Sequence, residues 1–206
     1  MAVKTDFGAS LSYLKKDPYL KEVIKTVGAI EHRRKHSGNL FRSLAESIIY
    51  QQLSGKAADT ILKRFIALFP GKTFPAPEDV KKISTAKLRS AGLSGQKSSY
   101  LKDLAAKCID GTISSRAFHT MSDEEVIQHL IAVKGIGRWT AQMFLMFTLA
   151  RADVLPVGDL GIQKGFQKVF GLRKLPSEKQ MMKLSQGWAG HRTLACFYLW
   201  RSLDQK

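Results

Sequence analysis

Helix caps, glycine stops and a helical spacing of apolar residues constrain the fold of this chain more than any other feature. From residue 40 to 53, apolar side chains recur every three or four residues, at Leu40, Phe41, Leu44, Ile48 and Leu53. This is the spacing of one buried helix face. No stretch alternates four or more β-branched residues with polar ones, as a half-buried strand would. We therefore expect a mainly or wholly α-helical fold.

Start and stop signals divide the chain into successive helices. The polar basic stretch EHRRKHSGN (31–39) is interpreted as a solvated loop. We expect a first helix that is opened by Asp17 and Pro18 and runs to Val27, a second over 40–53, and a third over 57–68 with the apolar stripe Ala57, Ile61, Phe65 and Leu68. Further helices are expected over 79–91, ended by Gly92, and from the GLSGQK turn to Gly111. The last two are expected from the cap Ser122 to about Val133 and over 139–149.

Charge limits the partners that such a helical protein could bind. The 206 residues include 33 Lys plus Arg against 17 Asp plus Glu, a net charge of +16 that is spread along the chain. A field of this sign favours a polyanion, most simply nucleic acid. An anionic membrane surface is the rival interpretation, and a basic surface that only improves solubility is the simplest one.

Cysteine usage and hydropathy argue against several other classes. Cys108 and Cys196 lie far apart and outside any Cys/His spacing, so we expect no disulfide framework, zinc site or iron–sulfur cluster. The N-terminus has no apolar signal core, and the longest nearly apolar run, 139–150, is about 12 residues. These observations predict a soluble intracellular protein with no membrane partner.

Two short turns, AGLSGQKSSYL and VKGIGRWTAQM, share one construction. Each places small residues and a nearby Lys or Arg between helical segments, with Lys97 at the first turn and Lys134 and Arg138 at the second. At Gly135 and Gly137 the backbone could approach a ligand closely, and the unpaired N–H groups that open the second helix could bind a phosphate oxygen. The alternative is an ordinary turn between two helices.

The string LIAVKGIGRWTAQMFLMF, followed by DVLPVGDLGIQKGF, resembles the helix-hairpin-helix DNA glycosylases, specifically their alkylpurine (3-methyladenine II) branch. LFRSLAESIIYQQLSGKAA, GLSGQKSSYL and WAGHRTLACFYLWR match further segments of that family in the same order, so the resemblance covers most of the chain from about Leu40. It implies one glycosylase unit over 1–206, all-α, with two helical subdomains and an active-site cleft between them. The central subdomain would span about 36–150, with the hairpin at 130–147, and the second would combine about 1–35 with 151–206.

The resemblance assigns the catalytic carboxylate to Asp159, in PVGDLGI. Breaking a C1′–N bond passes through a positively charged, oxocarbenium-like state, which a carboxylate can stabilise while it orients the attacking water. Asp159 is also well placed to cap the helix that follows it, and both roles can hold together. One departure from the family is Gly158, where many members carry a second acid.

The resemblance also bears on reaction type and substrate. Bifunctional members carry a nucleophilic lysine where this chain has Trp139, which implies hydrolysis alone and an abasic product. Alkylation at N3 or N7 makes a purine cationic, and an aromatic face attracts such a cation. Candidate walls of a base pocket are Trp139, Phe41, Phe147 and Trp188, each of which could instead be ordinary core.

A base inside a duplex must be flipped out, and the vacated space filled. The break QQLS at 51–54 matches the family's DNA-probing loop and offers Gln52, Leu53 and Ser54, although it could be a plain polar turn. In such proteins main-chain carbonyls of the hairpin often hold a monovalent cation. The matching residues here are Ile131, Val133 and Ile136. No other cofactor is expected.

Three functions remain open at this point. The first is a monomeric, monofunctional glycosylase that releases 3-methyladenine and 7-methylguanine from double-stranded DNA. The second is a non-catalytic binder of abasic or distorted DNA with the same fold. The third is a general helical DNA-binding module whose glycines are only turns. The presence of Asp159 favours the first, and the absence of an N-terminal β-rich domain suggests the compact form of the family.

Overall fold

The computed structural model describes residues 7–30, 39–116 and 118–204. By its contacts the chain divides into two compact units, and we describe each one by itself. The central unit is Gly38–Phe144, and the terminal unit combines Met1–Ser37 with Leu145–Lys206. The boundaries expected from the sequence, near 36 and 150, lie close to these. The expected cleft between the two subdomains stays a prediction.

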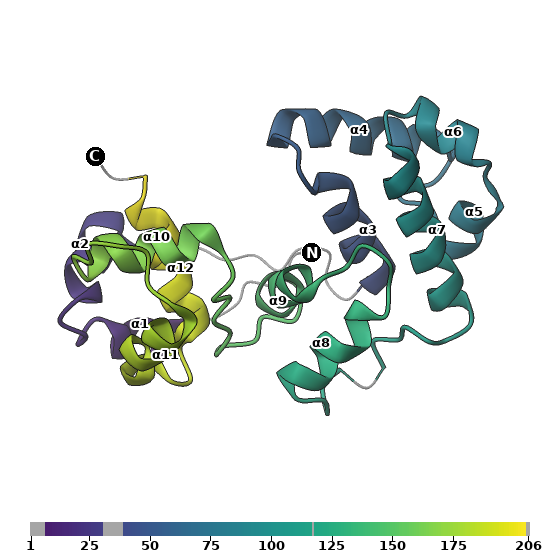
Figure 1. The fold of residues 1–206 in the computed structure, drawn as a ribbon. Helices are drawn as coiled ribbons and strands as arrows, with labels where there is room; N and C mark the ends of the chain where they lie inside the picture. Colours follow the sequence, from purple (N-terminus) through teal and green to yellow (C-terminus); the bar gives the residue numbers. More distant parts are fainter. Residues whose placement is uncertain (1–6, 31–38, 117, 205–206) are drawn as a thin grey trace. The chain divides into compact units, whose positions relative to one another are not determined.

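The central unit is built around one long helix, α7 (Figure 1). This helix packs against α3, α5 and α6, and α3 also contacts α4. Its core includes the fully buried side chains of Leu44, Ile48, Phe65, Leu101 and Leu104. The helices are α3 (Leu40–Tyr50), α4 (Gly55–Ala67), α5 (Pro77–Lys82), α6 (Thr85–Ser90), α7 (Gly95–Ile109), α8 (Asp123–Ile131) and α9 (Arg138–Phe147), whose last three residues belong to the terminal unit.

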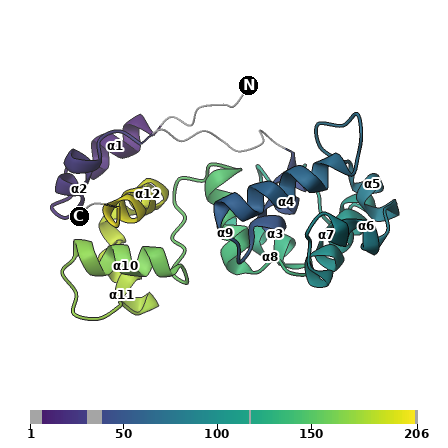
Figure 2. The same ribbon diagram turned by 90° about the horizontal axis from the view of Figure 1, so that it is seen from above.

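The terminal unit is assembled around α12, which packs against α10, α2 and α1 (Figure 2). The backbones of α10 and α12 lie close together, because a Cβ atom at Gly165 would be only 2.7 Å from the Cβ atom of Leu199. The helices are α1 (Gly8–Leu14), α2 (Leu20–Val27), α10 (Leu160–Val169), α11 (Glu178–Leu184) and α12 (Arg192–Ser202), with a single 3-10 turn, η1 (Gln186–Trp188), before α12.

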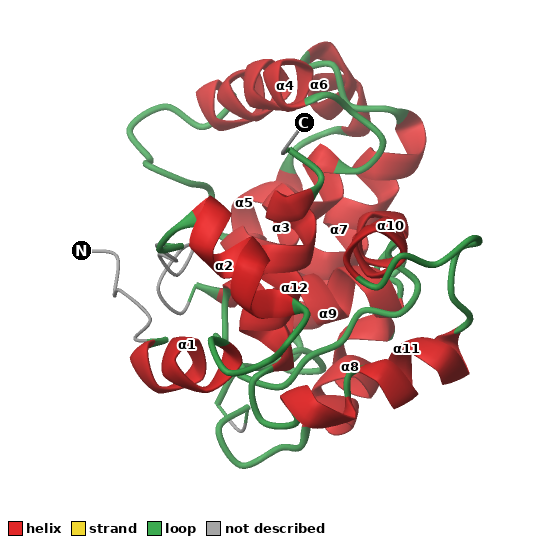
Figure 3. Ribbon diagram, turned by 90° about the vertical axis from the view of Figure 1, so that its left-hand side faces the viewer, coloured by secondary structure: helices red, strands yellow, loops and turns green. Residues whose placement is uncertain are grey.

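Helices and loops account for all of the chain that the structure describes, with no strand there, so the all-α prediction is confirmed (Figure 3). The start and stop signals also hold. Gly92 and Gly111 adopt positive φ angles where helices end, and Ser122 forms a capping box with Glu125 at the start of α8. Asp17 accepts the N–H of Leu20 at the start of α2.

Three expectations about helices are wrong. The single helix over 79–91 is two helices, because Ile83 is extended and the Ser84 side chain accepts the N–H of Lys87 to start α6. Helix α1 was not expected, since Phe7 at its N-cap position makes no side-chain cap. Leu53 and Ala57 are exposed and do not belong to the buried stripes. The loop expected at 31–39 lies outside the described residues except for Asn39, which caps α3.

Candidate active site and nucleic-acid interface

The turn between α8 and α9 is packed on one side and open on the other. Gly135 has φ +80°, and a Cβ atom there would lie 2.1 Å from the ring of Tyr100, so only glycine fits. The N–H of Lys134 donates to the Asp103 carboxylate over 2.8 Å. A Cβ atom at Gly137, in contrast, would meet nothing within 4 Å. The turn is therefore held from α7, while the backbone at Gly137 is accessible to a ligand.

Arg138, which begins α9, forms a two-pronged ion pair with Glu124 of α8. Its two terminal nitrogens donate to the two carboxylate oxygens over 2.9 and 2.6 Å. This pairing, helped by a hydrogen bond from Gln128, lowers the pKa of Glu124 to about 2. Both partners are more than half exposed, at 58% for Arg138 and 53% for Glu124. The predicted contact of Arg138 with phosphate stays a prediction.

The segment 51–54, which we call the probing loop, protrudes between α3 and α4. Gln52 has φ +57°, an uncommon conformation for a residue with a side chain. Gln52, Leu53 and Ser54 are exposed, and the apolar side chain of Leu53 is 38% accessible. Ser54 occupies the N-cap position of α4 without a side-chain cap hydrogen bond. An exposed apolar side chain in this loop suits insertion into a duplex.

Lys97 makes contacts other than the expected one. Its ammonium group donates to the main-chain carbonyls of Ile49 and Gln51, each over 2.7 Å. Partial burial lowers its pKa. Two of its three donors are thus used on the end of α3, which has carbonyls with no helical partner. These contacts place Lys97 under the probing loop, and its predicted contact with phosphate stays a prediction.

Asp159 sits at the start of α10, as its capping pattern predicts. Its Oδ1 atom accepts the N–H of Ile162 over 2.8 Å and the indole N–H of Trp200 over 2.9 Å. The carboxylate is half-buried. A Cβ atom at Gly161 would lie 2.8 Å from Cδ1 of Trp200 and 3.0 Å from Asp159 Oδ1. The indole therefore reaches the carboxylate only because residue 161 has no side chain.

An aromatic stack adjoins this carboxylate. Trp200 stacks on Phe147 and Phe197 with ring centroids 6.1 and 6.0 Å apart, and the two phenylalanine rings are 5.4 Å apart. Phe197 is buried, whereas Phe147 and Trp200 are half-buried. The hydrogen-bonded indole of Trp200 is thus one wall of an aromatic cluster.

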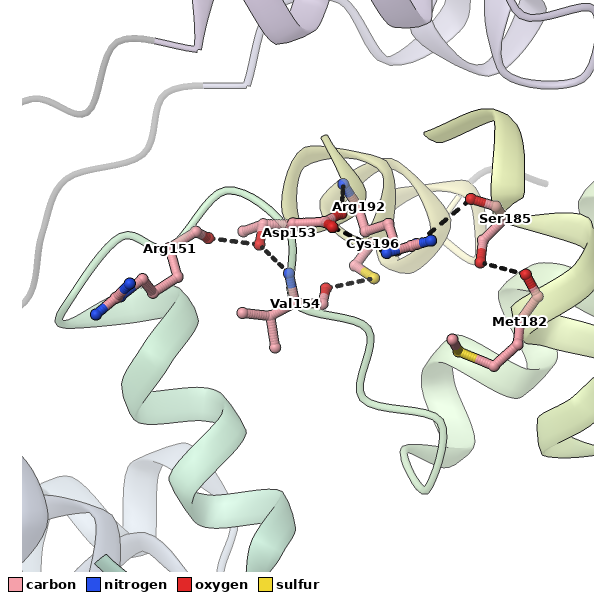
Figure 4. A network of polar contacts seen from close by, with 8 residues as sticks. Arg151, Asp153, Val154, Met182, Ser185, Arg192 and Cys196 are labelled. Atoms are coloured by element: carbon pink, nitrogen blue, oxygen red, sulfur yellow. Dashed lines mark hydrogen bonds and ion pairs between the residues drawn. The ribbon is translucent and has the colours of Figure 1, made fainter. Parts of the chain in front are cut away.

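The segment that leads to Asp159 is fastened to the start of α12 (Figure 4). Arg192 forms an ion pair with Asp153 over 2.9 Å. The hydroxyl of Thr193 donates to the carbonyl of Arg151 over 2.6 Å and accepts the N–H of Val154 over 3.0 Å. These contacts fix the chain a few residues before the catalytic candidate, so the position of Asp159 is set from both sides.

Two of the four aromatic pocket candidates are core residues. Trp188 is fully buried and donates its indole N–H to Asp17 over 2.8 Å. Phe41 is 6% exposed and packs edge-on against Phe74. The expectation that these two line a base pocket is wrong, because neither presents a face to a ligand. Trp139, in contrast, is 47% exposed.

Two residues beside Asp159 were missed in the sequence, namely Trp200 and Gly161. Trp200 lies in WAGHRTLACFYLWR, the segment assigned to the C-terminal helix, but nothing in its spacing ties it to a residue 41 positions earlier. Gly161 carries a usable signal, since glycine in the first turn of a helix is unfavourable unless another group approaches closely.

The structure also bears on metals and thiols. Among the described residues, no three His, Cys, Asp or Glu side chains gather where they could hold a metal ion. Burial raises the pKa of the buried Cys196 thiol and raises that of the half-buried Cys108 thiol to about 11.

The carbonyl of Val133 accepts the N–H of Ile136 over 3.1 Å and keeps a second lone pair. Of the helices in the described part of the chain, none has the length and apolar character that crossing a bilayer requires.

Comparisons with known proteins agree with this geometry. The sequence model described as HhH-GPD superfamily base excision DNA repair protein matches residues 45–190. DNA-3-methyladenine glycosylase 1 of Schizosaccharomyces pombe is 35% identical over 188 residues, which cover 90% of this chain and 82% of that protein. The DNA-3-methyladenine glycosylase of Saccharomyces cerevisiae is 37% identical over 82% of this chain and 61% of that protein.

Solved structures show the same likeness over the whole chain. The structure of S. pombe 3-methyladenine DNA glycosylase in complex with abasic DNA has a TM-score of 0.84 and 34% identity, and the match covers 95% of this chain and 97% of that one. A DNA-3-methyladenine glycosidase from Bacillus halodurans has a TM-score of 0.85 and 34% identity, and the match covers 100% of this chain and 93% of that one.

Proposed function

Because this chain belongs to the HhH-GPD superfamily of base excision DNA repair proteins, we propose that it is a monofunctional DNA-3-methyladenine glycosylase. It hydrolyses the N-glycosidic bond of an alkylated purine in double-stranded DNA and leaves an abasic site. Both 3-methyladenine and 7-methylguanine are proposed substrates. The observation that carries this proposal is the position of Asp159, a fixed carboxylate beside an aromatic cluster.

Asp159 is proposed to stabilise the positive charge that develops on the sugar and to orient the water that attacks C1′. Its Oδ1 atom is held by one main-chain N–H and one indole N–H. These two hydrogen bonds fix the orientation of the carboxylate before the substrate arrives. A carboxylate held in this way loses little orientational freedom when the reaction starts.

Capping a helix is not sufficient evidence for catalysis, as a second aspartate of the terminal unit shows. Asp17 accepts the N–H of Leu20 at the start of α2 through Oδ1 and the indole N–H of Trp188 through Oδ2, whereas Asp159 accepts Ile162 and Trp200 through Oδ1 alone. The two sites differ in their tryptophan, since Trp188 is fully buried whereas Trp200 is half-buried. Asp17 therefore provides a natural structural control for Asp159.

The proposed leaving group explains why no strong acid is needed. A purine alkylated at N3 or N7 carries a positive charge, which makes it a good leaving group and attracts it to an aromatic face. In the terminal unit the half-buried rings of Phe147 and Trp200 are the proposed binding faces, and in the central unit the exposed indole of Trp139 is a separate candidate. At Trp139 there is no amine to form a Schiff base, so the reaction stops at base release.

The central unit is proposed to hold the DNA. The hairpin turn at Gly135 and Gly137 contacts a phosphate through main-chain N–H groups, with Lys134 and Arg138 adding positive charge. Leu53, with Gln52 and Ser54, fills the space left by the flipped base. The carbonyls of Ile131, Val133 and Ile136 are hard oxygen donors that suit a Na⁺ or K⁺ ion at this turn when DNA is bound.

The proposal is tested by chromatography of the bases released from methylated duplex DNA in single-turnover reactions. Asp159→Asn keeps an acceptor for both the N–H of Ile162 and the indole N–H of Trp200 but removes the charge. We expect base release to slow by about 100-fold or more. The control variant Asp17→Asn has one acceptor oxygen for donors that Asp17 binds through two, so it should be less stable, but the folded variant should retain the wild-type rate.

Two results would contradict the proposal. Full base release by Asp159→Asn would refute the assigned mechanism. If the wild type bound an abasic analogue tightly but released no base from any alkylated substrate, the protein would be a non-catalytic binder of damaged DNA.

A further inference from the structure

Three side chains on one face of α7 hold the two segments that are proposed to contact DNA. Lys97, Tyr100 and Asp103 lie three residues apart and therefore on the same side of the helix. Lys97 donates to the carbonyls of Ile49 and Gln51, at the base of the probing loop. Tyr100 lies against Gly135, and Asp103 accepts the N–H of Lys134.

The probing loop and the hairpin turn are also joined directly. The side-chain amide of Gln51 donates to the carbonyl of Gly135 over 2.8 Å. The hydroxyl of Tyr50, the last residue of α3, donates to the carboxylate of Asp59 in α4. The loop is thus tied at its N-terminal end, and one of its ties reaches a residue 84 positions away.

These ties support a strained conformation. Gln52 has φ +57°, which is uncommon for a residue with a Cβ atom and persists only where the surrounding structure imposes it. The ammonium of Lys97 is bound to the residue immediately before Gln52, and the side chain of that same residue is bound to the hairpin. The N–H of Leu53 also donates to the carbonyl of Tyr50 over 3.3 Å, which closes a turn with Gln52 at its third position. Lys97 and Gln51 are the groups that tie this turn to α7 and to the hairpin.

We propose that Lys97, acting through Gln51, is a positioning residue that holds the probing loop in its inserting conformation and couples it to the hairpin turn. This inference rests on the proposed function, because it assigns Lys97 to the base-flipping step. Without the Lys97 ammonium, the probing loop would not hold its inserting conformation in advance. It would have to adopt that conformation while the base is being expelled, and this extra step would slow flipping.

The experiment uses Lys97→Met, which keeps the apolar stem and removes the ammonium. Lys102→Met is its matched control, because Lys102 also lies on α7 and also donates to two carbonyls at the end of a helix, those of Lys81 and Ile83. Gln51→Leu removes the link to Gly135 and provides a second test if Lys97→Met folds poorly. Each variant is assayed in single turnover on two duplexes.

The two duplexes contain 3-methyladenine opposite thymine or opposite an abasic-site analogue. Flipping is easier in the second duplex, because no pairing must be broken. We expect Lys97→Met to be about tenfold slower than the wild type on the first duplex and nearly equal to it on the second. Lys102→Met should match the wild type on both. In parallel, the fluorescence of 2-aminopurine beside the target base, which rises when its neighbour is flipped out, should rise less with Lys97→Met.

A purely structural role for Lys97 would slow both duplexes by the same factor. That result, or a wild-type rate and a wild-type fluorescence change in both Lys97→Met and Gln51→Leu, would overturn the inference. Failure of the proposed function is distinguishable, since the wild type would then release no base from either duplex. In that case the fluorescence comparison between wild type and Lys97→Met would still decide whether Lys97 supports flipping.

Discussion

Substituting Gly161 by alanine would disturb the contact that holds the catalytic candidate. The added methyl carbon would lie 2.8 Å from Cδ1 and 2.9 Å from Nε1 of Trp200, and 3.0 Å from Asp159 Oδ1. Contacts this short require one of these groups to shift. Trp200 cannot shift freely, because its ring is stacked on Phe147 and Phe197. The indole and the carboxylate are therefore expected to separate.

The size of the effect follows from opposing contributions. Alanine is a better helix former than glycine by about 1 kcal/mol in a helix interior and by less near the start of a helix. Overpacking of this kind costs about 1–3 kcal/mol. Loss of a hydrogen bond to a charged group costs about 1.5–3 kcal/mol, of which part is regained from water at a half-buried site. We expect Gly161→Ala to lower the free energy of unfolding by about 1–3 kcal/mol and to slow base release.

The assay combines urea denaturation, single-turnover base release and the NMR resonance of the Trp200 indole N–H. Gly165→Ala is the control, because it also overpacks α10 against α12 but collides with Leu199 instead of Trp200. Both variants should be less stable, but only Gly161→Ala should shift the indole resonance and slow a folded enzyme. If Gly161→Ala left stability, resonance and rate unchanged, the close approach of Trp200 to Asp159 would be refuted.

Two further predictions concern the hairpin. Gly135→Ala combines a positive φ angle with a collision against the ring of Tyr100, so it should lower the free energy of unfolding by about 2–4 kcal/mol. Gly137→Ala, where a Cβ atom meets open space, should change that free energy by less than about 1 kcal/mol and weaken DNA binding. Equal urea midpoints for the two variants would contradict this prediction. The carboxyl of Glu124 should titrate near pH 2 by NMR and move toward its ordinary 4.5 in Arg138→Gln. Since folding lowers this pKa, the ion pair stabilises the fold above about pH 4.5 and is lost as the pH falls through about 2. An unchanged midpoint in Arg138→Gln would mean that Arg138 does not set it.

Helix boundaries could be predicted from the sequence wherever one residue carries the physical cause. Ser122 caps α8 and Gly111 follows the end of α7 for reasons that depend only on their own side chains. The break at Ile83 and Ser84 was missed, because serine inside an apolar repeat is compatible with either a continuous helix or a new cap. Capping and stop residues thus placed most helices, but they could not decide whether Ser84 continues one helix or starts a new one.

Candidate site residues could be predicted less well, because their surroundings come from distant parts of the chain. Trp139 and Trp188 are both tryptophans near plausible site segments, yet one is 47% exposed and the other is fully buried against Asp17. Lys97 has the composition of a phosphate ligand, but its ammonium is turned toward carbonyls of α3. Residue type indicates what a side chain can do, whereas burial and partners decide which of those roles it has.

The pair Asp17 and Asp159 shows how a structural role and a catalytic role can be separated at one residue. At residue 159 one oxygen accepts both donors, so asparagine keeps the cap and the indole hydrogen bond without the charge. At residue 17 the two donors use separate oxygens, so asparagine keeps only one of these hydrogen bonds. Only a reaction that develops positive charge distinguishes the two residue types. Alanine at residue 159 would remove the cap and the charge together, and about 1 kcal/mol of stability with them. If Asp159→Asn lowers the rate of base release while folded Asp17→Asn keeps the wild-type rate, the charge of Asp159 is the catalytic element.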